Sequence, residues 1–132
     1  MIQEIKFRGR HKVSNCWYYG YLYKQDNDWI ITTDGYTRYV VEMGSVGQDT
    51  GLKDKNGKEI YEGDLLHYGL GVNDIDGSVW EVEWDKHTLG WYCFVHPDES
   101  VEGTGCNSLY YLNTQSTLAI VGNIYENPEL LK

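Results

Sequence analysis

The sequence predicts a mainly β protein whose antiparallel strands form a small, partly open barrel or a sandwich, with little helix. Apolar and polar side chains alternate with a period of two along much of the 132-residue chain, as in half-buried strands. Aromatic residues make up 14%, with 12 Tyr and 5 Trp against 2 Phe, and flat rings pack well on a pleated surface. Turn signals separate these runs at intervals of roughly 8–12 residues, which is typical of barrels and sandwiches.

The first part of the chain predicts short strands joined by local turns. We expect strands at residues 5–8, 17–23, 29–32 and 36–42. The turns fall at Asp26-Asn27-Asp28 and at Thr33-Asp34-Gly35, where short polar residues and glycine are favoured. Residues 44–50 are polar and contain glycine, so they are the best candidate for a hinge. We therefore expect one domain, 1–132, or alternatively two β subdomains at about 1–45 and 50–132.

The second part predicts denser strands. Asn56-Gly57 is a strong turn signal because both residues tolerate positive φ, and Glu62-Gly63-Asp64 is another turn. Trp80, Val82 and Trp84 alternate with Glu81 and Glu83, so we expect the two carboxylates on a solvated face. Further strands are expected at 65–68, 91–95 and 118–125, with loops at 69–77 and 97–107. Asn127 as a cap and Pro128 at the first helical position predict a short helical turn.

Charge is distributed unevenly along the chain. Residues 1–58 carry nine Lys/Arg and seven acids, a net charge of +2, whereas residues 59–132 carry two lysines and thirteen acids, a net charge of −11. An acidic surface repels a phosphate backbone, which makes nucleic acid the less favoured partner. The asymmetry leaves room for self-association between unlike patches. It also suggests, as an alternative function, an acidic inhibitor or DNA mimic directed at a host DNA-binding protein.

The cysteines and the absence of apolar segments predict a cytoplasmic protein. Cys16, Cys93 and Cys106 are odd in number and lack CxxC spacing, so we expect no disulfide framework. Cys93 lies in an apolar run, where a buried and inert thiol is expected. The N-terminus is charged where a signal peptide would be apolar. No segment approaches the roughly 18 apolar residues of a membrane span, so no membrane partner is expected.

Three blocks of the chain resemble the YopX family. The central block, residues 50–64, reads TGLKDKNGKEIYEGD, the opening block, 4–8, reads EIKFR, and the closing block, 121–131, reads VGNIYENPELL. The resemblance implies a β-rich intracellular protein of unknown function, encoded in phages or prophages mainly of Gram-positive bacteria. It would then act in the cytoplasm of the bacterial host cell. No catalytic or ligand-binding residues of the family carry over to this chain.

The residue types that carry chemistry show no enzyme signature. The histidines lack metal-site spacing, so we expect no metal and no cofactor. Glycines recur at positions 51, 57 and 63, but the Gly-Lys-Ser/Thr ending of a phosphate loop is missing. Glu62 and Asp64 facing a groove are the remaining enzyme alternative. We expect a non-enzymatic protein.

The predicted function is protein–protein contact, with a protein partner or a second copy in a homo-oligomer. Tyr is enriched at interfaces, and the aromatic strand carries rings on both faces, which cannot all be core unless both faces are covered. The simplest interpretation places Trp17, Tyr19 and Tyr21 in the core and Tyr18 at an interface, and our candidate interface is the whole stretch from Trp17 to Tyr23. The candidate interface residues are Trp17, Tyr18, Tyr19, Tyr21, Tyr23, Lys53, Asp54, Lys55, Asn56, Lys58, Glu62 and Asp64.

Nucleic-acid binding through the N-terminal edge is the first alternative. Single-strand binders interleave basic residues with aromatic rings, because bases stack on the rings while the cations hold phosphates. The candidate residues for this function are Lys6, Arg8, Arg10 and Lys12. The net charge of −9 makes this alternative less favoured than a protein interface.

Overall fold

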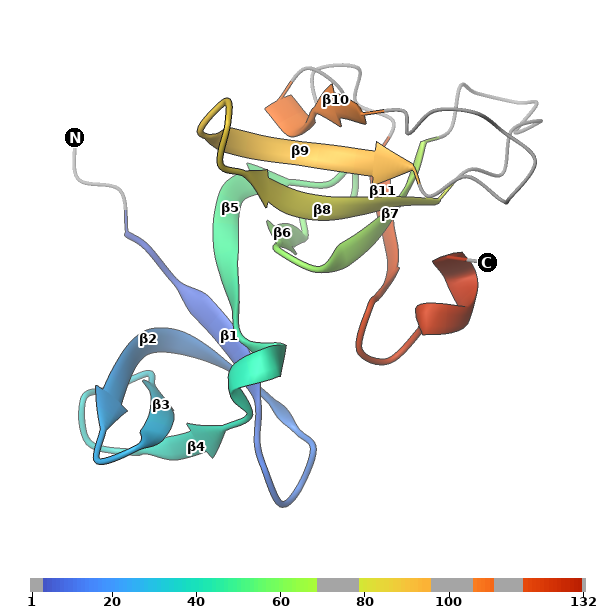
Figure 1. Ribbon diagram of the computed structural model, residues 1–132. Coiled ribbons are helices and arrows are strands. Elements are labelled where there is room, and N and C mark those ends of the chain that lie inside the picture. The colour runs from blue at the N-terminus through green and yellow to red at the C-terminus, as the bar shows by residue number, and fades with distance from the viewer. Residues whose placement is uncertain (1–3, 69–78, 96–105, 111–117, 132) are drawn as a thin grey trace. The chain divides into compact units, whose positions relative to one another are not determined.

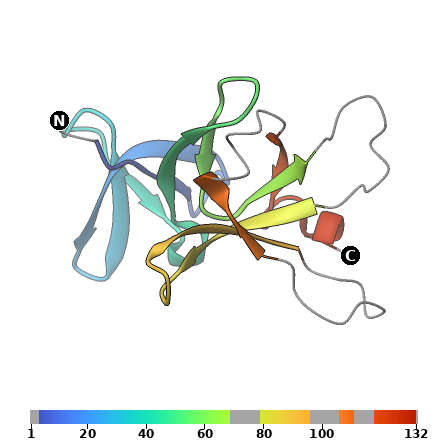
Figure 2. The same cartoon turned by 90° about the horizontal axis from the view of Figure 1, so that it is seen from above.

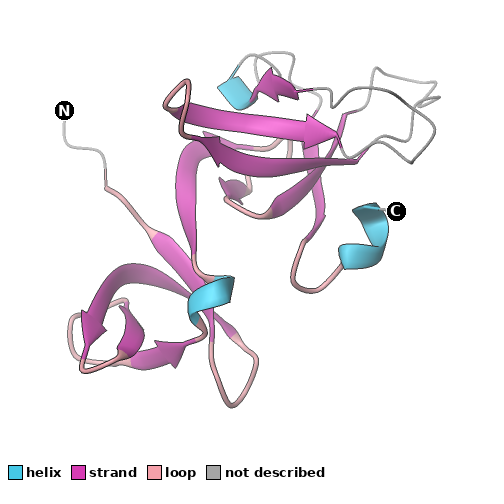
Figure 3. Cartoon of the chain, viewed as in Figure 1, coloured by secondary structure: helices cyan, strands magenta, loops and turns pink. Residues whose placement is uncertain are grey.

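The computed structural model describes residues 4–68, 79–95, 106–110 and 118–131, and in these residues strands joined by loops and turns predominate (Figures 1 and 3). Every strand pairing described is antiparallel, and helix is confined to short turns, which confirms the mainly β fold. The described strands do not form a closed barrel. The chain divides into two compact units, Met1–Asp49 and Thr50–Lys132.

The first unit is an antiparallel meander that returns to its own first strand. Its elements are β1 Phe7–Arg10, β2 Trp17–Gln25, β3 Asp28–Thr32, β4 Tyr39–Val41 and the 3-10 turn η1 Met43–Ser45. The pairing order is β4-β3-β2-β1. A bridge between His11 and Val41 joins the last strand to the end of β1, and the Glu42 N–H donates to the Arg10 carbonyl at 2.9 Å. The sheet therefore curls around one face.

The core of the first unit lies on this enclosed face. Ile31 and Val41 are 0% and 1% exposed. Gly9 allows β1 to approach them, since a Cβ at position 9 would lie 2.8 Å from Val41 Cγ2. Tyr18 stacks on Tyr39 with ring centroids 3.6 Å apart. Because these side chains pack closely around Gly9, a methyl group added at that position would strain the core.

A carboxylate organises the connection from β3 to β4. Asp34 accepts hydrogen bonds from the backbone N–H groups of Thr37 and Tyr36, at 2.6 and 2.8 Å, and from the Thr37 hydroxyl at 2.9 Å. These bonds favour the ionised form and lower the pKa of Asp34 to about 2. The turn expected at residues 33–35 is therefore present, and it extends to a longer loop.

Strand β5, Gly47–Lys53, crosses the boundary between the units. Phe7 and Arg8 of β1 pair with Gln48 and Gly47 at its beginning. In the second unit β5 neighbours β6, Glu59–Tyr61. Residues 44–50, expected as a hinge, form the end of η1 and the first part of this strand.

The second unit contains a second antiparallel sheet (Figures 1 and 2). Its strands are β7 Asp64–Tyr68, β8 Val79–Asp85, β9 Gly90–Val95, β10 Cys106–Ser108 and β11 Leu118–Asn123, in the order β10-β9-β8-β7-β11. One face packs on a buried cluster that includes Ile60, Leu66, Val82, Cys93 and Leu118. The short 3-10 turn η2, Pro128–Leu131, confirms the helical turn expected there.

The remaining expectations concern loops and membrane spans. The loop expected at 69–77 and most of the one at 97–107 lie outside the described residues. None of the helices that the structure describes has the length and apolar character needed to cross a bilayer.

Candidate functional site

Three tyrosines of β2 form an exposed aromatic surface on the first unit, which we call the tyrosine face. Tyr19, Tyr21 and Tyr23 alternate along the strand, and their exposed fractions are 45%, 49% and 36%. The expectation that Tyr19 and Tyr21 belong to the core is therefore wrong. Tyr18, expected at an interface, is half-buried on the opposite face, where it stacks on Tyr39.

Strand pairing explains which side chains of β2 face the core and which are exposed. Leu22 lies opposite Ile31 in the register of β2 and β3, so the even-numbered side chains of β2 share the enclosed face with the core. The odd-numbered tyrosines lie on the other face, where Tyr21 and Tyr23 pair with the buried Thr32 and Ile30. The Tyr21 hydroxyl donates to the Glu4 carboxylate at 3.4 Å, a contact on the surface. The tyrosine face thus leaves large, amphipathic side chains accessible to a partner.

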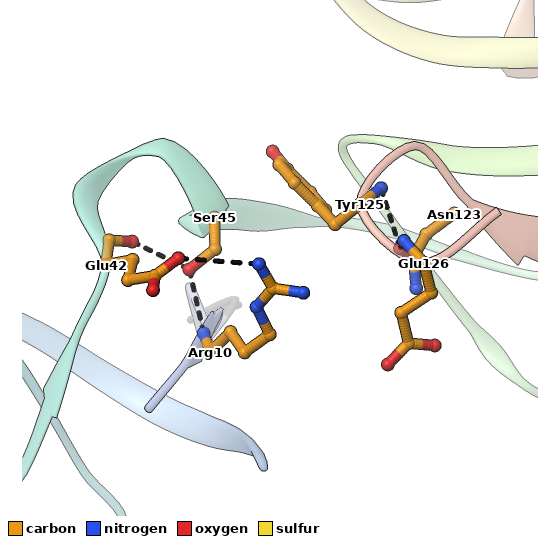
Figure 4. A network of polar contacts seen from close by, with 6 residues as sticks. All are labelled: Arg10, Glu42, Ser45, Asn123, Tyr125 and Glu126. Atoms are coloured by element: carbon orange, nitrogen blue, oxygen red, sulfur yellow. Dashed lines mark hydrogen bonds and ion pairs between the residues drawn. The ribbon is translucent and has the colours of Figure 1, made fainter. Parts of the chain in front are cut away.

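The cations proposed for nucleic-acid binding are largely engaged within the first unit. Arg8 is only 5% exposed and lies over the Trp17 ring, 5.0 Å from its centroid. Arg10 pairs with Glu42 at 3.5 Å, while its backbone N–H donates to the Ser45 hydroxyl at 2.8 Å (Figure 4).

Lys12 pairs with Asp28, also at 3.5 Å. Lys6 is half-buried. The edge therefore presents less uncompensated positive charge than the sequence suggested, since two of its cations face carboxylates.

Asp54 is the structural centre of the hairpin between β5 and β6. Its Oδ1 accepts from the backbone N–H groups of Asn56 and Lys58, both at 2.9 Å, and its Oδ2 accepts from the Ile120 N–H at 3.1 Å. Burial to 7% exposure raises the pKa of the carboxyl, but the hydrogen bonds from Ile120, Lys58 and Asn56 outweigh that effect, so the pKa is lowered from its ordinary value. Asp54 thus links the hairpin to β11, 66 residues away.

The second turn of the central block uses a carboxylate in the same way. Asp64 is 2% exposed, and its Oδ2 accepts from the Tyr61 N–H at 2.8 Å. Gly63 has φ +88°, a conformation that favours glycine, and its N–H donates to the Val82 carbonyl at 2.9 Å. With Asp54 and Asp64 buried, the accessible candidates at this hairpin are Lys53, Lys55, Asn56 and Lys58.

A cavity of about 410 Å³ opens on the second unit, and we call it the acidic cavity. Three segments that are distant in sequence line it: the turn at 62–63, residues 81–86 of β8 and the following turn, and 124–125 after β11, with one residue of β9. Its charged lining residues are Glu62, Glu81, Glu83, Asp85 and Lys86. Its aromatic lining residues are Trp84, Phe94 and Tyr125.

The carboxylates that line the cavity differ in exposure and in hydrogen bonding. Glu81 is 7% exposed, so the expectation that it lies on a solvated face is wrong, whereas Glu83 is exposed as expected. Asp85 accepts hydrogen bonds from the Thr88 hydroxyl at 2.6 Å and the His87 N–H at 3.1 Å. These bonds favour the ionised form and lower the pKa of Asp85 from its ordinary value.

An asparagine pair shapes the chain that closes one side of the cavity. Asn123 Oδ1 accepts from the Tyr125 and Glu126 N–H groups at 3.0 and 2.9 Å (Figure 4). The Asn127 N–H donates to the Asn123 carbonyl at 2.8 Å. The closing block of the sequence is therefore a hydrogen-bonded turn, and this turn places Tyr125 in the cavity wall.

Metal-binding residues do not assemble in the part of the chain that the structure describes. Within those ranges no group of three or more His, Cys, Asp and Glu is placed to hold a metal ion. His11 lies edge-on to Tyr18 and Tyr39, with centroids 6.0 and 6.5 Å away. Cys93 is buried, and burial raises the pKa of its thiol to about 12, as an inert thiol requires.

Comparisons with known proteins cover nearly the whole chain. A family model described as YopX protein matches residues 2–132. The chain is similar to the crystal structure of protein EF1440 from Enterococcus faecalis, with 25% sequence identity over 98% of this chain and 99% of that chain and a TM-score of 0.56. No curated protein matches the chain.

Proposed function

The chain belongs to the YopX family, and we propose that it is a non-catalytic, phage-type protein that binds a protein partner through the tyrosine face. The observation that carries the proposal is the exposure of Tyr19, Tyr21 and Tyr23 along one side of β2. Tyrosine supplies a large, rigid contact area with a polar tip, and it is enriched where proteins meet.

The packing behind the tyrosine face favours its interpretation as a binding surface. The stacked pair of Tyr18 and Tyr39 and the buried Ile31 back the strand that presents the three rings. A preorganised surface loses little side-chain entropy on binding. Aromatic anchors on such a surface are the residues that most often dominate binding energy.

A protein partner fits the surroundings of the tyrosine face better than nucleic acid does. Single-strand binding would require free cations beside the rings. Here Arg10 and Lys12 pair with carboxylates, and Arg8 is buried over Trp17. Binding that weakens steeply between 50 and 200 mM salt with single-stranded DNA would favour nucleic acid instead.

The test compares capture by the wild-type protein and by a Tyr19→Ala/Tyr21→Ala/Tyr23→Ala variant from lysate of a strain that carries the gene. Truncation of an anchor typically costs about 2 kcal/mol, so the triple variant should recover the specific partner at least about tenfold less efficiently. Light scattering of the purified protein measures in parallel whether a second copy is the partner.

Tyr36→Ala provides the matched control, because Tyr36 is 90% exposed and lies outside the tyrosine face. This control should bind the partner like the wild type, and circular dichroism should show unchanged β structure in both variants. Equal capture by the triple variant and the wild type would rule out the tyrosine face as the interface.

A further inference from the structure

We propose that the acidic cavity of the second unit binds an arginine side chain presented by a basic segment of a protein partner. The inference rests on the charge, the wall chemistry and the size of the cavity, and it is independent of the tyrosine face.

The cavity concentrates negative charge. Among the described residues that line it, four carry carboxylates, Glu62, Glu81, Glu83 and Asp85, and one, Lys86, carries a positive charge. The surrounding unit adds to the potential, because residues 50–132 contain five lysines and fourteen acids, a net charge of −9. A cleft lined by one sign of charge focuses the field and attracts the opposite charge.

The walls of the cavity favour a planar cation. Phe94 lies opposite Glu81 in the pairing of β8 and β9, and the Tyr125 ring lies beside Gly63, so both contribute aromatic surface near the carboxylates. Guanidinium stacks on aromatic faces and binds carboxylates through two parallel hydrogen bonds, whereas a lysine ammonium is a compact and strongly hydrated point charge. The combination of rings and carboxylates therefore selects arginine over lysine.

Burial strengthens the electrostatic attraction at one side of the cavity. Glu81 is only 7% exposed, and attraction between charges is stronger in a wall from which water is largely excluded. The volume of about 410 Å³ lies within the usual range for ligand sites, roughly 300–1,000 Å³. The cavity can therefore admit an arginine together with parts of the residues that flank it.

The decisive experiment titrates the full-length protein with an acetylated Gly-Gly-Arg-Gly-Gly peptide and follows the assigned backbone amide signals of Glu83 and Tyr125 by NMR. One matched peptide carries citrulline, which has nearly the shape of arginine but no charge, and a second carries lysine. We expect the arginine peptide to shift these amide signals, with the citrulline peptide binding at least tenfold more weakly and the lysine peptide binding with intermediate affinity.

A charge-neutralised variant locates the site. Glu83→Gln should weaken binding of the arginine peptide at least threefold, whereas Glu129→Gln, which removes the same charge from an exposed position in η2 outside the cavity lining, should bind like the wild type. Tyr19→Ala/Tyr21→Ala/Tyr23→Ala should also retain peptide binding, which separates this site from the tyrosine face.

Three results would overturn the proposal. The first is equal affinity for the arginine and citrulline peptides, and the second is equal loss of affinity in Glu83→Gln and Glu129→Gln. The third is a shift of the Glu83 and Tyr125 amide signals that depends on protein concentration in the absence of peptide and that the arginine peptide does not reverse. That result would assign the cavity to a second copy of the chain.

Discussion

Replacing Asp54 with asparagine tests whether one carboxylate stabilises the second unit. The Asp54 carboxylate accepts three backbone N–H bonds, from Asn56, Lys58 and Ile120. Asparagine can keep the two bonds to Oδ1 but places an amide NH₂ where Oδ2 faces the Ile120 N–H. A hydrogen bond to a charged group contributes about 1.5–3 kcal/mol, so Asp54→Asn should lower the unfolding free energy by about that amount.

Alanine at this position should cost more, because all three donors lose their acceptor. Asn56 and Lys58 are exposed, so water can hydrate their N–H groups, but Ile120 is half-buried. We expect Asp54→Ala to destabilise the unit by about 3–5 kcal/mol. The assay is native-state hydrogen exchange followed on peptides from β11, because it reports on the second unit even where the two units unfold separately.

The pH dependence of the unfolding free energy provides a second test of the role of Asp54. The pKa of Asp54 is lowered in the folded protein, so its contribution is fully present above its unfolded pKa of about 3.8 and is lost as the pH falls through the lower folded value. The stability difference between the wild type and Asp54→Asn should therefore shrink below about pH 4. A difference under about 0.5 kcal/mol at pH 7, or one that grows on acidification, would refute the reasoning.

Three further predictions follow from local geometry. Gly63→Ala forces a side chain into the left-handed region and should lower the unfolding free energy by about 1–2 kcal/mol in urea denaturation. Gly122→Ala places a methyl group onto the side chain of Asn127, and hydrogen exchange of the β11 amides should show a loss of about 1–3 kcal/mol. Cys93 should resist iodoacetamide in the folded protein at pH 8, whereas the exposed Cys16 should be alkylated, as peptide mass mapping can show.

The sequence by itself determined the local structure. Alternating side chains along residues 17–23 and 80–84 predicted strands, and both strands are present. The turn at Asn56-Gly57 and the helical turn after Asn127 follow from residues that favour those backbone angles, which are properties of a few neighbouring residues. The inert character of Cys93 also followed from its apolar neighbours.

Tertiary structure alone decided which faces are covered. Alternation divides a strand into two faces but does not say which of them meets a core, because the partner comes from elsewhere in the chain. Tyr19 and Tyr21 were expected inside and are exposed, although their cross-strand neighbours Arg8 and Thr32 are buried. Glu81 was expected in solvent and is buried, although its strand was placed correctly.

The acidic cavity and the role of Asp54 depend on contacts between distant segments. The cavity joins Glu62, the end of β8 and Tyr125, and no local pattern signals that these segments converge. The bond from Ile120 to Asp54 likewise spans 66 residues. Hydrophobic collapse and strand pairing bring such groups together only when the whole sheet forms. Patterns among neighbouring residues therefore predict the turns, but they do not predict which distant residues contact those turns.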